Sequence, residues 1–237
     1  MEQIANIIFF TLLAGMAMPL GAAVARYEHI HRRWLENEFR HSVIAFGGGA
    51  LLSAVALVLV PEGIDHVDIF TAAGSFICGG FAFMGIDRML ARLRTPAGQL
   101  TAMLADFIPE SLALGAAFAI DSTGAVLLAG LMALQNMPEG FNAYREMRHT
   151  VKVRPGRLLG LFALMALLGP IAGVSGYLWL AGNPAVVAAI MLFAAGGILY
   201  SIFEDIAPQA VLKKHWAPPM GAVFGFALGI AGNILTR

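Results

Sequence analysis

The segment that decides the fold runs from Leu104 to Gly140 and reads LADFIPESLALGAAFAIDSTGAVLLAGLMALQNMPEG. Two strongly apolar stretches are joined by the turn signal Asp121-Ser122-Thr123-Gly124. Each stretch carries a proline followed by a glutamate in its interior, as Pro109-Glu110 and Pro138-Glu139. This pattern predicts a hairpin of two hydrophobic helices with a polar site inside it.

Four polar side chains of this hairpin are predicted to converge. In an antiparallel helix pair that turns at residues 122 and 123, Glu110 and Gln135 are equally far from the turn and therefore lie at one level. Asp106 and Glu139 form a second level about 6 Å further along the helix axis. The i, i+4 spacing also places Asp106 on the face of Glu110, and Gln135 on the face of Glu139.

The composition of the chain excludes a soluble domain, since 59% of its residues are hydrophobic and only 13% are charged. We expect an all-α integral membrane protein with eight transmembrane helices in a single domain, residues 1–237. Apolar runs long enough to cross a bilayer fall at residues 4–24, 41–61, 69–91, 98–120, 125–147, 158–181, 184–210 and 218–236. The first run follows Glu2 and no basic residue, which favours a retained helix over a signal peptide.

The basic residues predict the orientation of these helices. All Lys and Arg except Arg237 lie in or beside the first, third, fifth and seventh connections between the predicted helices. The positive-inside rule makes these connections cytoplasmic, so both termini face outward. The formal net charge of zero argues against a nucleic-acid partner. The short loops favour a multi-pass protein of a bacterial inner membrane, with the lipid bilayer as its surroundings.

The acids of the hairpin are best explained by a cation. A charged side chain at membrane depth costs about 3 kcal/mol or more, and no Lys or Arg lies in the middle of a predicted helix to neutralise Asp106, Glu110 and Glu139. The alternative is that these groups are protonated and bonded to neighbouring helices. All six histidines lie in loops or at helix ends, so the site is rich in oxygen and suits manganese, iron(II) or magnesium at least as well as zinc.

Acids near two other helix ends leave alternatives open. Glu204 and Asp205 are either carboxylates of an exit path or partners of Lys213 and Lys214. Acidic residues around Asp68, near the outer end of the second predicted helix, form either a vestibule that attracts cations or a solvated loop.

The chain resembles the Zrt/Irt-like protein (ZIP) family of divalent metal transporters. The resemblance rests on eight predicted helices and on two Pro-Glu signatures. Residues 135–140, Gln-Asn-Met-Pro-Glu-Gly, match the family's fifth-helix motif closely, and residues 106–111, Asp-Phe-Ile-Pro-Glu-Ser, match its fourth-helix motif in part. Residues 196–208 of the seventh predicted helix also look like a motif of the family.

The resemblance implies which residues bind the metal. Glu110 and Glu139 correspond to bridging ligands, and Asp106, Gln135 and Asn136 correspond to terminal ligands. Four positions depart from the family pattern: Asp106 stands where a histidine is usual, Phe107 where an asparagine is usual, Leu51 near a usual methionine, and Gly169 at a usual glutamate. These departures favour a single all-oxygen site over a two-metal site.

The resemblance also implies a mechanism. Metal transport by this family uses alternating access, in which a bundle containing the fourth and fifth helices slides against a second bundle, within a homodimer. The transported ion would be zinc, manganese, iron(II), cobalt or cadmium, and no resident cofactor is expected. One rival is a transport-inactive homologue that senses metal or regulates a partner. A membrane-embedded enzyme is disfavoured, because the chain has no His-Glu-x-x-His motif and no Ser/His pair at depth.

Overall fold

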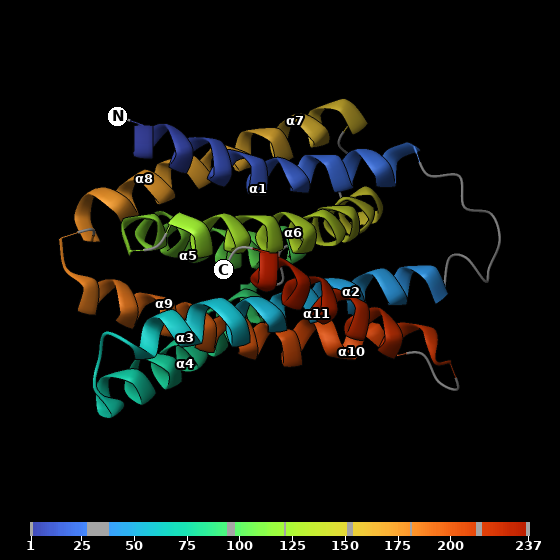
Figure 1. Cartoon of the computed structure of the whole chain (residues 1–237). Coiled ribbons are helices and arrows are strands. Elements are labelled where there is room, and N and C mark those ends of the chain that lie inside the picture. The colour runs from blue at the N-terminus through green and yellow to red at the C-terminus, as the bar shows by residue number, and fades with distance from the viewer. Residues whose placement is uncertain are drawn as a thin grey trace.

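A computed structural model describes residues 2–27, 38–93, 98–120, 122–150, 154–180, 182–211 and 215–235. For a few helical residues, Asp106 among them, the backbone is described and the side chain is not. Throughout the described ranges the regular structure is helical (Figure 1), in agreement with the all-α prediction.

In chain order the helices are α1 (Glu2–Tyr27), α2 (Arg40–Ala54), η2 (Val55–Leu59), α3 (Val60–Ile64), α4 (Ile69–Leu93), α5 (Gly98–Ile120), α6 (Ser122–Thr150), α7 (Pro155–Ala166), α8 (Leu168–Leu180), α9 (Pro184–Ser201), η3 (Ile202–Ile206), α10 (Ala207–Ala210) and α11 (Ala217–Leu235). The elements η2 and η3 are single π-helical stretches inside longer helices.

Within the described ranges, six helical segments are long and apolar enough to cross a membrane: Glu2–Tyr27, Arg40–Ile64, Ile69–Met89, Pro155–Leu180, Pro184–Ala210 and Ala217–Leu235. Three of these segments combine shorter helices, namely α2 to α3, α7 with α8, and α9 to α10. The remaining two predicted spans form α5 and α6, which are not among these six segments; within α5, Phe107–Ala119 is a shorter apolar segment. The architecture is that of an all-helical, multi-pass membrane protein.

The helices form two lobes, one above the other in Figure 1. The first lobe contains α1, α5, α6, α7 and α8, and the second lobe contains α2, α3, α4, α9, α10 and α11. The most extensive contacts are made inside a lobe, by α1 with α6 and α5 with α8 in the first, and by α2 with α11 and α4 with α9 in the second. The lobes meet mainly where α2 packs on α6 and where α5 packs on α9.

Glycine allows the close approach of helices inside each lobe. A Cβ atom at Gly21 of α1 would overlap the carbonyl oxygen of Met137, and one at Gly140 of α6 would overlap that of Met18. Three more helix pairs repeat this reciprocal arrangement, with Gly115 and Gly176 between α5 and α8, Gly49 and Gly225 between α2 and α11, and Gly79 and Gly196 between α4 and α9. The small residues of the last helix, α11, therefore let it pack closely against α2 of the same chain.

Prolines account for the irregular turns of the long helices. The element η2 ends two residues before Pro61, and η3 ends two residues before Pro208. Since proline has no N–H, it leaves the carbonyl four residues back without its helical partner. For Pro61 that carbonyl belongs to Leu57, and Asn233 of α11 donates its Nδ2 hydrogen bond to it at 3.2 Å.

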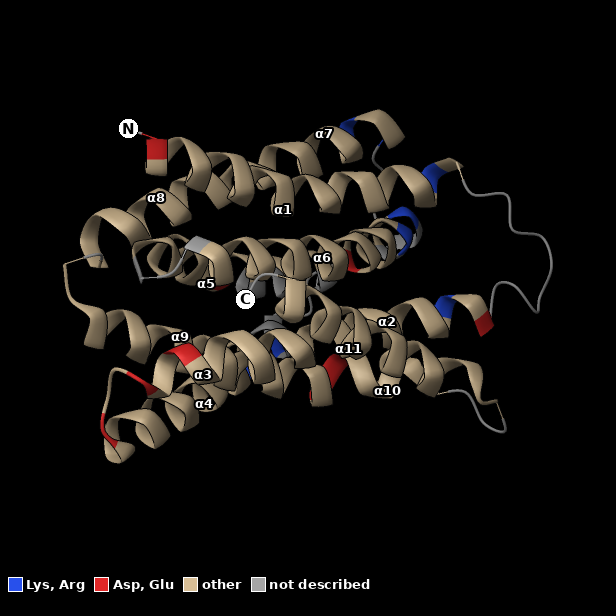
Figure 2. Cartoon of the chain, viewed as in Figure 1, with Lys and Arg blue, Asp and Glu red and all other residues tan. Residues whose placement is uncertain are grey.

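The outer surface suits a lipid environment. Large apolar side chains are exposed along the sides of the lobes, for example Phe9, Phe81, Ile171 and Phe224, each more than half exposed. Lys and Arg lie at the end of the molecule where α1 ends, α2 begins, α6 ends and α7 begins, and further ones lie in the second lobe away from that end (Figure 2). The orientation that the sequence predicts from its basic residues stays a prediction.

Asp68 has a local structural role. Its carboxylate accepts hydrogen bonds from the N–H groups of Phe70 and Thr71 at 2.9 and 3.2 Å and from the Thr71 hydroxyl at 2.5 Å. These bonds, the hydroxyl first, hold the pKa of the Asp68 carboxyl below its usual range. Asp68 therefore caps the start of α4, a function that needs no bound cation.

The reciprocal glycine contact between α1 and α6 can be tested by substitution. We expect Gly140→Ala to lower the free energy of unfolding by about 1 to 3 kcal/mol, because the added methyl group must push α1 away. Gly130→Ala, on the same helix, is the matched control, since no atom lies within 4 Å of a Cβ at that position. Unfolding in mixed detergent micelles, followed by circular dichroism, measures both. Equal stability of the two variants would contradict the assigned contact.

Candidate metal site

The hairpin brings Glu110 and Gln135 together inside the first lobe. Gln135 Nε2 donates hydrogen bonds to Glu110 Oε1 and Oε2 at 2.9 and 2.7 Å. Both residues are buried, with Glu110 4% and Gln135 2% exposed. The prediction that these two residues lie at one level of an antiparallel hairpin is confirmed.

The second predicted level is only partly described. Asp106 lies in α5, and its side chain is outside the described part of the structure. Glu139 lies in α6 one turn after Gln135 and is half-buried. The convergence of Asp106 with Glu139 therefore stays a prediction.

Asn136 connects the hairpin to α1. It is 1% exposed, and its Nδ2 donates a hydrogen bond to the carbonyl oxygen of Ala14 at 2.9 Å. Within the described residues, Asn136 Oδ1 and Gln135 Oε1 are buried and have no hydrogen-bond partner. An unpaired buried acceptor costs about 1 to 3 kcal/mol, which a bound cation would offset. Two neutral oxygen atoms are thus available on this turn of α6, and Gln135 carries the one whose carboxamide lies against the Glu110 carboxylate.

Pro138 places this site at the boundary between the lobes. Its ring packs against Gly47 of α2, where a Cβ atom would lie 3.2 Å from Pro138 Cγ. The neighbouring glycine, Gly48, packs on Ile206 of η3. The polar turn of α6 therefore faces α1 through Asn136 and lies next to the second lobe through Pro138.

The Phe107 side chain accounts for two departures from the pattern of the ZIP family that the chain resembles, those at Phe107 and Gly169. Its side chain is fully buried, and its Cζ would lie 2.7 Å from a Cβ at Gly169 and 2.8 Å from a Cβ at Gly15. The ring thus fills the space that side chains at these two glycines would need. Leu51, a further departure, is a buried core residue of α2.

Sequence reasoning missed one polar residue of this helix face, Asn142. It is 7% exposed, and its Oδ1 has no hydrogen-bond partner among the described residues. Gln135, Glu139 and Asn142 follow the i, i+4, i+7 spacing of a single helix face, which was the available signal. The polar face of α6 therefore extends from the site toward the basic end of the molecule.

The described residues do not complete a metal site by themselves. Among them, no group of three or more His, Cys, Asp or Glu side chains lies close enough to hold a metal ion. The Asp106 side chain is outside that set, and the amide oxygens of Gln135 and Asn136 are of a different type. What the described geometry supplies is one buried carboxylate with carboxamides on a neighbouring helix.

The two acids near the end of α9 lie apart in the chain from this cluster, in η3. Glu204 is exposed and Asp205 is half-buried. On the facing helix α4, Asp87 accepts a hydrogen bond of 3.4 Å from the Tyr200 hydroxyl. Lys213 and Lys214, the alternative partners of Glu204 and Asp205, are outside the described residues, so the choice between an exit path and ion pairs stays open.

Comparisons of the sequence with protein-family models and with curated proteins find no match.

The bond between Glu110 and Gln135 predicts a coupled effect on stability. We expect Gln135→Leu to lower the free energy of unfolding by about 1 to 3 kcal/mol, because the buried Glu110 loses two hydrogen bonds. Glu110→Leu/Gln135→Leu is expected to cost less than the sum of its single variants, by about 0.5 to 3 kcal/mol. Chemical unfolding in micelles measures all three variants.

Gln209→Leu, at a half-buried glutamine of α10, is the control for this cycle and is expected to stay within about 0.5 kcal/mol of the wild type. Strictly additive effects of Glu110→Leu and Gln135→Leu would contradict the pairing.

Proposed function

We propose that the protein is a divalent metal cation transporter of the ZIP type, which moves metal toward the cytoplasm through a site between α5 and α6. The observation that carries the proposal is the buried Glu110 carboxylate, paired with the Gln135 carboxamide inside an apolar bundle. A buried acid of this kind is costly in a membrane and marks a functional site by default.

The ligand set in this proposal is Asp106, Glu110, Gln135, Asn136 and Glu139. All of its donors are oxygen atoms, which suits manganese, iron(II) and zinc, with cobalt and cadmium as further candidates. Gln135 Nε2, which donates to Glu110 in the structure, has to leave that carboxylate when a cation binds. Rotation of the carboxamide by half a turn then offers Oε1 to the same cation.

The space around Phe107 supports a single metal rather than two. The ring fills the volume beside Gly15 and Gly169, so side chains that could supply a second set of ligands have no room at these two positions. The proposed substrate is therefore one cation held by carboxylates and carboxamides.

The division into two lobes supports alternating access. Reciprocal glycine contacts hold the helices together inside each lobe, whereas side chains such as the Pro138 ring form the boundary between α6 and α2. A movement of the first lobe against the second would expose the site to one side of the membrane and then to the other. Metal would enter from the outer side and leave toward Glu204 and Asp205.

In the proposed topology α5 and α6 complete eight spans, and both termini face outward. The protein would work as a homodimer in a bacterial inner membrane. No catalytic step is assigned to it.

Metal uptake into proteoliposomes tests the function. Zinc, manganese, iron(II), cobalt and cadmium are offered in parallel to the wild type and to Glu110→Gln/Glu139→Gln, which keeps the size of both side chains. We expect uptake of at least one metal by the wild type and a loss of about tenfold or more in the double variant. Glu2→Gln, which removes a carboxylate from an exposed position outside the proposed site and path, should transport like the wild type.

A second candidate is a transport-inactive homologue that senses metal, favoured by the apolar Phe107 and Leu51 at family ligand positions. Metal binding by the wild type without uptake would select this candidate. Uptake that persists in Glu110→Gln/Glu139→Gln would overturn the assigned site, and absence of both binding and uptake would overturn both candidates.

A further inference from the structure

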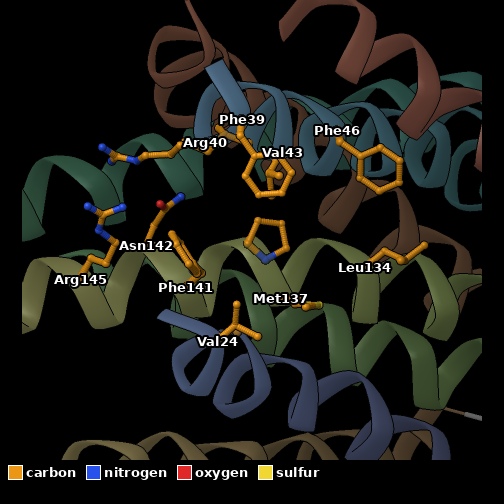
Figure 3. Close-up of a pocket in the computed structure, with 13 residues that line it drawn as sticks. Val24, Phe39, Arg40, Val43, Phe46, Leu134, Met137, Phe141, Asn142 and Arg145 are labelled. Carbon is orange, nitrogen blue, oxygen red and sulfur yellow. The ribbon is translucent and has the colours of Figure 1, made fainter. Parts of the chain in front are cut away.

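A second site lies where α1, α2 and α6 meet, at the boundary between the lobes (Figure 3). It is a cavity of about 250 Å³ whose walls are almost entirely apolar. The apolar lining includes Val24 of α1, Val43 and Phe46 of α2, and Leu134 and Met137 of α6. Val24, Leu134 and Met137 are 49%, 36% and 43% exposed, so the cavity opens onto the outer surface of the bundle.

One end of this cavity is polar and basic. Arg40, Asn142 and Arg145 lie together at that end (Figure 3). Arg40 begins α2 in the second lobe, and Arg145 belongs to the last turns of α6 in the first lobe. Asn142 is 7% exposed, and its Oδ1 has no hydrogen-bond partner among the described residues, although it lines the cavity.

This combination fits an amphiphile and does not fit a metal ion. Two guanidinium groups repel a divalent cation and bind a phosphate group through several donors each. The apolar walls provide no ligand atoms for a hydrated ion, whereas they can pack against a hydrocarbon chain. The free acceptor of Asn142 suits a hydroxyl donor next to the phosphate.

We propose that this cavity binds one anionic phospholipid, with part of an acyl chain between α1, α2 and α6 and with its phosphate on Arg40 and Arg145. Phosphatidylglycerol meets each requirement, since it has a single negative phosphate and a glycerol head group whose hydroxyl can donate to Asn142 Oδ1. The bound lipid touches both lobes and therefore stabilises them in the present arrangement. Binding does not depend on metal transport. The proposed orientation places the basic end of the cavity at the cytoplasmic leaflet, and only this placement rests on that orientation.

Native mass spectrometry of the full-length protein in a neutral detergent tests this site. Dioleoyl phosphatidylglycerol and dioleoyl phosphatidylcholine are titrated separately, and the lipid-bound fraction gives each affinity. We expect phosphatidylglycerol to bind the wild type about tenfold more tightly or better, at about fivefold for each arginine. Arg40→Gln/Arg145→Gln should abolish this preference.

Two further variants make the test specific. Val24→Phe keeps both charges and fills the apolar part from a half-exposed position, so it should weaken the binding of both lipids. Arg154→Gln/Arg157→Gln removes the same charge from exposed positions outside the cavity and should bind like the wild type. A melting curve of each lipid-free variant shows whether it is folded.

Three results would overturn the proposal. The first is equal binding of the two lipids by the wild type, and the second is a preference for phosphatidylglycerol that survives in Arg40→Gln/Arg145→Gln. The third is a dimer in the same spectra that Val24→Phe converts to monomer without any change in lipid binding, because the cavity would then hold a second copy of the chain.

Discussion

A carboxylate that is buried among apolar helices needs a polar partner, and in this chain Glu110 has one in Gln135. This pairing joins α5 to α6 and fixes their relative height. Asn136, the next residue, joins the same turn to α1 through the Ala14 carbonyl. Three helices of the first lobe are therefore connected at the level where Pro109 and Pro138 interrupt the regular helical bonding.

The two kinds of contact in the molecule have different consequences. Inside each lobe, glycines let backbones touch, and such contacts leave little room for relative movement. Between the lobes, the Pro138 ring meets Gly47, and an apolar cavity separates parts of α2 from α1 and α6. Both proposed ligands, a cation and a lipid, lie at or near the boundary between the lobes.

Much of the central hairpin could be predicted from the sequence, because helix geometry and the turn at residues 122 and 123 fix which residues lie level. The pairing of Glu110 with Gln135 follows from counting alone. The packing of Phe107 against Gly15 and Gly169 could not be predicted, since it depends on how distant helices approach one another. The cavity near Asn142 could not be predicted from the sequence either, because its walls come from three separate helices.

The most direct test of the account is the coordination of zinc bound to the purified protein, measured by X-ray absorption spectroscopy together with the metal content per chain. The proposed site predicts one zinc per chain with only oxygen neighbours at about 2.0 to 2.2 Å. Multiple scattering from imidazole rings, a sulfur neighbour, or two zinc ions per chain would contradict a single site built from carboxylates and carboxamides.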